Sequence, residues 1–258
     1  MTRKPLVVFD FDGVIIDGIP EYWRSSRKAC LKLLESKLDN FQLPNDVPQE
    51  FKYLRPWVKH GWEMVLLAAE FLRPNSSLLK KGFKNFAKDY HRNCNESLEI
   101  WEWSPKQLQE ALDNVRRESI ANDFHKWINS HQVFPGISER LKNFKLEGIE
   151  IVVLTTKNAD FTNQLLNSFA IKADLLYGYQ SGSKTSVLIE LSKKRRIEGF
   201  IEDRRTTLEE VINTPEIASI PCFLASWGYL KPNDCKDLPT GIFLLEPRTF
   251  EQPLANWN

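Results

Sequence analysis

The stretch LVVFDFDGVIID, residues 6–17, decides the fold class of this chain. Four apolar residues form a short hydrophobic run, and two aspartates one position apart, Asp10 and Asp12, follow it before Gly13. Continuous apolar runs are typical of strands that are covered on both faces, as in a parallel α/β sheet. Ligands bind beyond the carboxyl ends of such strands. Because two adjacent carboxylates repel each other unless a cation or a proton transfer uses them, the pattern favours a functional site over a solvated acidic turn.

Four more apolar runs repeat this pattern along the second half of the chain. Amphipathic segments with helical spacing lie between them, and this alternation predicts a doubly wound, mainly parallel α/β sheet. The predicted strands are Leu6–Phe9, Ile149–Leu154, Phe200–Ile201, Pro221–Ala225 and Ile242–Leu245.

The segment 18–131 has another texture, with one helical pattern following the next. Helices are predicted over Pro20–Ser36 and Trp62–Leu72, and Ser104 before Pro105 has the pattern of a helix N-cap. A long apolar stripe then runs from Leu108 to Ile128. We therefore predict an α/β catalytic core made of residues 1–17 and 132–258, interrupted by a helical cap domain at 18–131.

Composition and charge exclude several classes of protein. The chain has 258 residues, 42% of them hydrophobic, and a formal net charge of +1, which is ordinary for a globular protein and unlike a disordered chain. This balance argues against a nucleic-acid partner, and the basic run 193–196 is predicted to be a solvated helix end. The four cysteines lack metal-site spacing, and no apolar run reaches the length of a signal sequence or a membrane span. We expect a cytoplasmic protein without a membrane partner.

Three other segments add polar groups to the ends of predicted elements. Thr155-Thr156 follows the second strand, Glu202-Asp203 follows the third, and Ser183-Lys184 opens a helix between them. Each has a plain alternative when it is taken singly, namely a strand end, a helix cap or a solvated lysine. Together they suit phosphoryl transfer, in which carboxylates hold Mg²⁺, a hydroxyl and an ammonium hold phosphate oxygens, and an aspartate attacks phosphorus.

The order of these motifs resembles that of the haloacid dehalogenase superfamily, in its phosphatase and phosphomutase branch with a helical cap, which includes phosphoglycolate phosphatase-like proteins. The resemblance implies a Rossmannoid core with the cap inserted after residue 17. The matching segments are DFDGV (10–14), FPG (134–136), LTTK (154–157), GSKT (182–185), FIED (200–203) and WGY (227–229).

The resemblance implies a role for each motif residue. Asp10 resembles the nucleophile that forms an aspartyl-phosphate, and Asp12 resembles the general acid and base whose backbone carbonyl also binds the metal. Thr155 and Lys184 resemble the pair that binds the reacting phosphate. The remaining implied residues are Glu202 and Asp203, with Asp10, as magnesium ligands, and Gly13 and Thr156 as substrate-binding residues.

The chain also departs from the family pattern. Thr156 stands where many relatives carry asparagine, and Thr207 stands where many carry a further aspartate. The presence of Asp12 counts against a dehalogenase, which needs neither a phosphoryl acid/base nor magnesium. In the cap, a loop over Arg55–Glu63 is predicted to reach the site, with Arg55 binding the substrate. The alternative for this loop is a polar surface with its tryptophans packed inward.

These observations predict a magnesium-dependent phosphatase that hydrolyses a small phosphorylated metabolite through an aspartyl-phosphate. The first alternative is a phosphomutase similar to β-phosphoglucomutase, which would use the same residues. The second is a catalytically silent binding protein on the same fold. The identity of the substrate and the oligomeric state cannot be read from the sequence.

Overall fold

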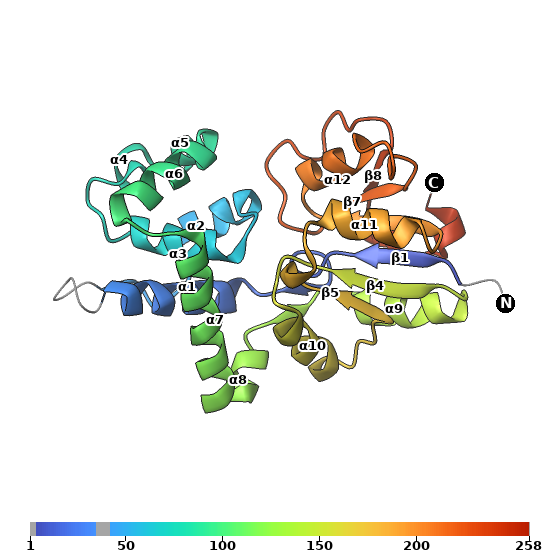
Figure 1. Ribbon diagram of the computed structural model, residues 1–258, viewed down its shortest axis with the longest axis horizontal. Helices are drawn as coiled ribbons and strands as arrows, with labels where there is room; N and C mark the ends of the chain where they lie inside the picture. Colours follow the sequence, from blue (N-terminus) through green and yellow to red (C-terminus); the bar gives the residue numbers. More distant parts are fainter. Residues whose placement is uncertain (1–3, 35–41, 258) are drawn as a thin grey trace. The chain divides into compact units, whose positions relative to one another are not determined.

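The computed structural model describes residues 4–34 and 42–257. The chain divides into two compact units. An α/β unit consists of Met1–Asp17 and Gln132–Asn258, and a helical unit consists of Gly18–His131 (Figure 1). The last two residues of the helix predicted over Pro20–Ser36 lie outside the described residues.

A six-stranded parallel sheet forms the centre of the α/β unit, in the order β5-β4-β1-β6-β7-β8. This arrangement confirms the predicted fold class. The strands β1, β4, β6 and β7 are almost entirely buried, which explains the apolar runs Leu6–Phe9, Ile151–Leu154, Phe200–Ile201 and Cys222–Ala225 within them. The strands are β1 (Leu6–Phe9), β4 (Glu150–Leu154), β5 (Leu175–Tyr177), β6 (Ile197–Glu202), β7 (Cys222–Ala225) and β8 (Ile242–Leu245).

Helices cover both faces of this sheet (Figure 1). Alternate side chains of β1 show the division: Leu6 and Val8 pack in the apolar core beneath α11 and α12, whereas Phe9 makes edge-on ring contacts with Phe144 of α9 and Phe250 of α13. The helical elements of this unit are α9 (Ile137–Leu146), α10 (Ala159–Ser168), η2 (Tyr179–Ser181), α11 (Lys184–Ser192), α12 (Arg205–Ile212), α13 (Pro247–Phe250) and η3 (Leu254–Asn256).

A short antiparallel pair stands where the chain leaves the α/β unit and where it returns. Strand β2 (Ile16–Asp17) pairs with β3 (Gln132–Val133), so residues more than 110 positions apart close this ladder. Each strand has two residues, and neither is among the strands predicted from the sequence.

Helices make up the second unit. A buried ion pair joins helices α1 and α7 of this unit. Two nitrogens of the Arg116 guanidinium each donate a hydrogen bond at 2.9 Å to one oxygen of the Glu21 carboxylate. Among the described helices, none combines the length and apolar character that a membrane span requires. The elements are α1 (Ile19–Leu34), α2 (Gln49–Leu54), η1 (Arg55–Trp57), α3 (Gly61–Glu70), α4 (Ser77–Lys81), α5 (Phe83–Lys88), α6 (Tyr90–Trp101), α7 (Pro105–Asn122) and α8 (Phe124–Ile128).

One prediction for the helical unit needs correction and another is refined. The apolar stripe from Leu108 to Ile128 spans two helices, because Asp123 ends α7 and its side chain accepts a hydrogen bond from the Lys126 amide to cap α8. The segment Arg55–Glu63 is not a simple loop, since it contains the 3₁₀ turn η1 and the first turn of α3. The predicted cap of α7 is confirmed, because the Ser104 hydroxyl accepts from the Gln107 amide at 3.2 Å.

Candidate active site

The carboxyl ends of three neighbouring strands bring the predicted motifs of the α/β unit together. In register, Phe9 of β1 lies beside Val153 of β4 on one side and Ile201 of β6 on the other. The residues that follow these strands therefore lie at one edge of the sheet. Asp10 extends the ladder by one bond, because its amide donates to the Ile201 carbonyl at 2.8 Å.

Lys184 links two of the carboxylates at this edge. It is the first residue of α11, and Ser183 caps that helix by accepting a hydrogen bond from the Ser186 amide at 3.1 Å. The Lys184 ammonium lies 2.7 Å from Asp10 Oδ1 and 2.6 Å from Glu202 Oε2. The helix start therefore delivers a half-buried cation between two buried acids that lie 192 positions apart in the sequence.

This pairing sets the protonation of both partners. Burial raises the pKa of Asp10 to about 7; Glu202 also raises it, while Lys184 opposes the rise. Burial by itself lowers the pKa of Lys184, but Asp10 and Glu202 outweigh burial and hold that pKa above its usual range. Lys184 is consequently a permanent cation at neutral pH. Asp10 has more negative charge around it than Lys184 alone balances.

Asp203 completes a cluster of three buried carboxylates. One oxygen from each of Asp10, Glu202 and Asp203 lies within 4.8 Å of the other two. Glu202 is held by Lys184 and by the Arg204 amide, which donates to its Oε1 at 3.1 Å. Oxygen donors at this spacing are the kind of ligand set that a hard divalent cation binds.

The position of Asp203 is fixed by a close-packed clamp. A Cβ atom on Gly13, whose φ is +96°, would lie 1.9 Å from Asp203 Oδ2, and one on Gly228 would lie 2.3 Å from Asp203 Cβ. Between them the Tyr229 amide donates to Asp203 Oδ2 at 2.8 Å. Both glycines are therefore required by contact with this carboxylate. That contact is what the structure shows for Gly13, and its predicted role in substrate binding stays a prediction.

Asp12 has its own buried cation. The Lys157 ammonium lies 3.2 Å from both carboxylate oxygens of Asp12, and only 2% of the Lys157 side chain is exposed. The Lys157 amide donates to the hydroxyl of Thr155 at 3.0 Å, which orients the segment after β4. The two aspartates of the first motif are thus paired with different lysines.

The remaining predicted residues stand as follows. Thr155 is buried at the end of β4, where its amide donates to the Tyr177 carbonyl at 2.9 Å, and Thr156 beside it is half-buried. Arg55 belongs to the helical unit, where its guanidinium lies over the Tyr22 ring, 5.2 Å from the ring centre. Because the two units are described separately, the predicted reach of Arg55 to the substrate stays a prediction.

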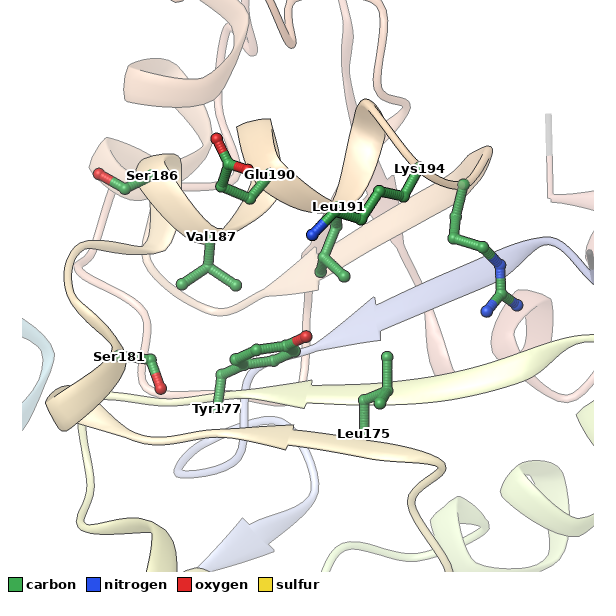
Figure 2. A pocket seen from close by; sticks show the side chains of 9 residues that line it. Leu175, Tyr177, Ser181, Ser186, Val187, Glu190, Leu191 and Lys194 are labelled. Atoms are coloured by element: carbon green, nitrogen blue, oxygen red, sulfur yellow. The ribbon is translucent and has the colours of Figure 1, made fainter.

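A separate cavity of about 370 Å³ lies along the edge strand β5 and helix α11. Figure 2 shows Tyr177 and Leu175 of β5 facing Val187 and Leu191 of α11 across it. None of the clustered carboxylates lines this cavity. It shares helix α11 and Tyr177 with the surroundings of the candidate site but none of its carboxylates, so we do not assign it to the site.

Sequence reasoning missed two contributors. Lys157 and Tyr229 lie within the matching motifs, but the sequence pattern predicts no role for either. The signal for Tyr229 was weak, because the function of its amide depends on a fold that brings residues 203 and 229 together. The signal for Lys157 was a charge immediately after a buried strand and two threonines, a place where a solvated lysine would be unusual.

The fold and this edge define a doubly wound α/β protein with an acidic, oxygen-rich site at the carboxyl ends of its central strands. A family model described as haloacid dehalogenase-like hydrolase matches residues 4–188. The chain belongs to the haloacid dehalogenase-like hydrolase family. No match was found among curated proteins.

Solved structures give the same picture of the fold. A predicted phosphoglycolate phosphatase from Haemophilus somnus 129PT aligns over 90% of this chain and 89% of its own length, with a TM-score of 0.55 and 16% identity. A predicted phosphatase from Clostridium acetobutylicum aligns over 94% of each chain, with a TM-score of 0.53 and 17% identity. A haloacid dehalogenase-like family hydrolase from Streptococcus pneumoniae aligns over 96% of this chain and 97% of its own, with a TM-score of 0.55 and 17% identity. At these identities the likeness establishes the fold.

Proposed function

We propose that this protein is a magnesium-dependent phosphatase that hydrolyses a small phosphorylated metabolite through an aspartyl-phosphate on Asp10. One observation carries the proposal, the charge balance of the candidate site. Asp10, Asp12, Glu202 and Asp203 supply four negative charges when ionised, while Lys157 and Lys184 supply two positive ones. The acids outnumber the lysines, and this excess of negative charge favours the binding of a divalent cation.

The residues present fit magnesium. Mg²⁺ prefers oxygen ligands and is commonly held by one or two carboxylates together with waters and substrate phosphate. We propose that Asp10 and Asp203 bind it through carboxylate oxygens and Asp12 through its backbone carbonyl, with Glu202 completing the acidic pair. When bound, the cation would supply positive charge for the oxygens of the transferring phosphoryl group.

In the first half-reaction, the Asp10 carboxylate attacks the phosphorus of a phosphate monoester. The bond from phosphorus to the ester oxygen breaks, and Asp12, protonated at this stage, gives its proton to that oxygen, so that an alcohol leaves. Lys184 offsets the repulsion between the Asp10 carboxylate and the phosphate dianion, and the hydroxyl of Thr155 binds a phosphate oxygen.

In the second half-reaction, the Asp12 carboxylate takes a proton from water. The water oxygen attacks the phosphorus of the aspartyl-phosphate, inorganic phosphate leaves, and Asp10 is restored as a carboxylate with Asp12 again protonated. The sum is one monoester and one water giving one alcohol and one inorganic phosphate.

Two further points belong to this proposal. The structural relative described as a predicted phosphoglycolate phosphatase supports small phosphorylated acids as the first substrates to test. We also propose that the enzyme works in the cytoplasm, and the free state of all four cysteines, three of them buried, supports a reducing setting.

The test is the release of inorganic phosphate from a panel of phosphorylated metabolites, with and without Mg²⁺, for the wild type and for Asp10→Asn. We expect magnesium-dependent release by the wild type alone. Conversion of a sugar phosphate into its isomer without phosphate release would favour the phosphomutase instead. Binding of a metabolite with no turnover at any magnesium concentration would favour the silent binding protein.

A further inference from the structure

Lys157 is the second lysine at the acidic edge of the α/β unit, and the proposed reaction gives it no step. Its side chain is 2% exposed, although lysine is among the residue types least often buried unless they are paired. Its ammonium lies 3.2 Å from each oxygen of Asp12. Since 145 positions separate the two residues, the fold itself creates this contact.

The backbone of Lys157 is as firmly placed as its side chain. The Lys157 amide donates to the Thr155 hydroxyl at 3.0 Å, and its carbonyl accepts a hydrogen bond from the Tyr179 amide at 3.1 Å. Gly178 packs against the same carbonyl so closely that a Cβ atom there would lie 2.9 Å from it. Lys157 is therefore anchored from two neighbouring segments before its side chain meets Asp12.

We infer that Lys157 is the positioning residue for Asp12, which it orients for proton transfer through equal contacts to both carboxylate oxygens. The ion pair to the anchored ammonium holds the Asp12 carboxylate in place, because a turn of the side chain about its Cα–Cβ bond would carry both oxygens away from Lys157. Proton transfer needs the acid within about 3 Å of the ester oxygen, so the loss of this orientation would slow the step.

Lys184 provides the internal contrast. Its ammonium contacts Asp10 and Glu202, and the family resemblance assigns it to the reacting phosphate. Lys184 therefore serves every phosphate monoester alike. Lys157 serves Asp12, whose proton matters most when the leaving group is a poor one. The fall in kcat/KM on replacing Lys157 should therefore depend on the leaving group of the substrate, whereas the fall on replacing Lys184 should not.

The experiment rests on the proposed function and compares two substrates of similar size. Benzyl phosphate releases an alkoxide that needs a proton, whereas 4-nitrophenyl phosphate releases a stable phenolate that does not. The variants are Lys157→Met, which keeps the length of the side chain without its charge, Lys157→Arg and Lys184→Met. Lys194→Met, an exposed lysine of the cavity in Figure 2, is the matched control and should leave both rates unchanged.

For Lys157→Met we expect kcat/KM to fall by about 10²-fold or more with benzyl phosphate and by less than about 10-fold with 4-nitrophenyl phosphate, within the range of a positioned acid. Lys157→Arg should restore part of the loss. Lys184→Met should lower both substrates by similar factors. An equal fall of both substrates in Lys157→Met, with a raised KM, would overturn the inference and assign Lys157 to phosphate binding, and unchanged kinetics would reduce the pair to a structural role.

A wild type that hydrolyses neither substrate would contradict the proposed function rather than this inference. Crystal structures of the wild type and Lys157→Met then decide the inference without turnover. We expect the Asp12 carboxyl group to leave its present orientation in the variant while Asp10 keeps its place. An Asp12 side chain that superimposes in the two structures would overturn the positioning role.

Discussion

Replacement of Gly228 by alanine adds one methyl group to the clamp that fixes Asp203. The new Cβ atom would lie 2.3 Å from Asp203 Cβ and 2.6 Å from the carbonyl oxygen of Gly13, where ordinary contacts begin at about 3.4 Å. Neither neighbour is the end of a flexible side chain. Asp203 or the loop at Gly228 must therefore move by about 1 Å.

This displacement should change both the catalytic rate and the magnesium concentration that the enzyme requires. A misplacement of about 1 Å in a catalytic constellation costs about 10²-fold in rate, which corresponds to about 2.7 kcal/mol in the activation barrier. We expect Gly228→Ala to lower kcat/KM for 4-nitrophenyl phosphate by about this factor. The Mg²⁺ concentration that gives half of the maximal rate should rise at the same time, because Asp203 is a proposed ligand.

Gly148→Ala is the matched control. Gly148 has a φ of +74° and no atom within 4 Å of its missing Cβ, so alanine there strains the backbone without touching the site. We expect a lower melting temperature with unchanged kcat/KM and magnesium requirement. If Gly228→Ala kept both quantities within about two-fold of the wild type, the clamp would not hold a functional carboxylate and the reasoning would fail.

Three other measurements test the nucleophile, the cation and an ion pair. Asp10→Asn should reduce turnover by at least about 10³-fold, because an amide is no nucleophile towards phosphorus. Stopped-flow or end-point phosphate assays would measure the loss. Activity close to that of the wild type would mean that the nucleophile is another residue. EDTA should abolish phosphate release and added Mg²⁺ should restore it, with Asp203→Ala needing more Mg²⁺ than the wild type, whereas full activity in EDTA would exclude the proposed cation. Glu147→Gln should lower the melting temperature at pH 7. Burial raises the pKa of Glu147, but hydrogen bonds from Arg140 and from the Leu254 amide together hold that pKa below the ordinary 4.5. The ionised carboxylate therefore stabilises the folded state. The difference in melting temperature between the variant and the wild type should be complete above pH 4.5 and should vanish as the pH falls through the lowered pKa. A difference that persists at lower pH would assign the loss to packing instead of charge.

The strands that can be predicted from the sequence are those whose burial produces a run of apolar residues. Leu6–Phe9 is buried at every position, and a run of apolar residues is the direct consequence. Strand β5 is half-buried at all three positions because it is the edge of the sheet, and its composition does not distinguish it from a helix end. Strands β2 and β3 exist only through pairing across the helical insertion, which no local pattern records.

The candidate site follows the same division. The order of the motifs predicts which carboxylates meet, because the ends of parallel strands share one edge. The partners of those carboxylates depend on the reach of side chains and amides from distant segments. The Tyr229 amide meets Asp203 because the loop after β7 turns back over the edge, and the Tyr229 hydroxyl also donates to Asp17 at 2.6 Å. Contacts of this kind could be found only in three dimensions.

The two aspartates of the first motif lie in different environments, and each environment suits the role proposed for its residue. Phe11 lies between them and is 1% exposed, so the chain alternates and leaves Asp10 and Asp12 on the site side of the strand end. Asp10 is buried beside Glu202 and Lys184, an environment that withdraws it from water and suits a nucleophile. Asp12 is half-buried and its carboxyl group is held at both oxygens by Lys157, an environment that suits a group exchanging a proton with water and substrate. Because the two aspartates differ in their lysine partners, removing each lysine in turn tests the two proposed roles separately.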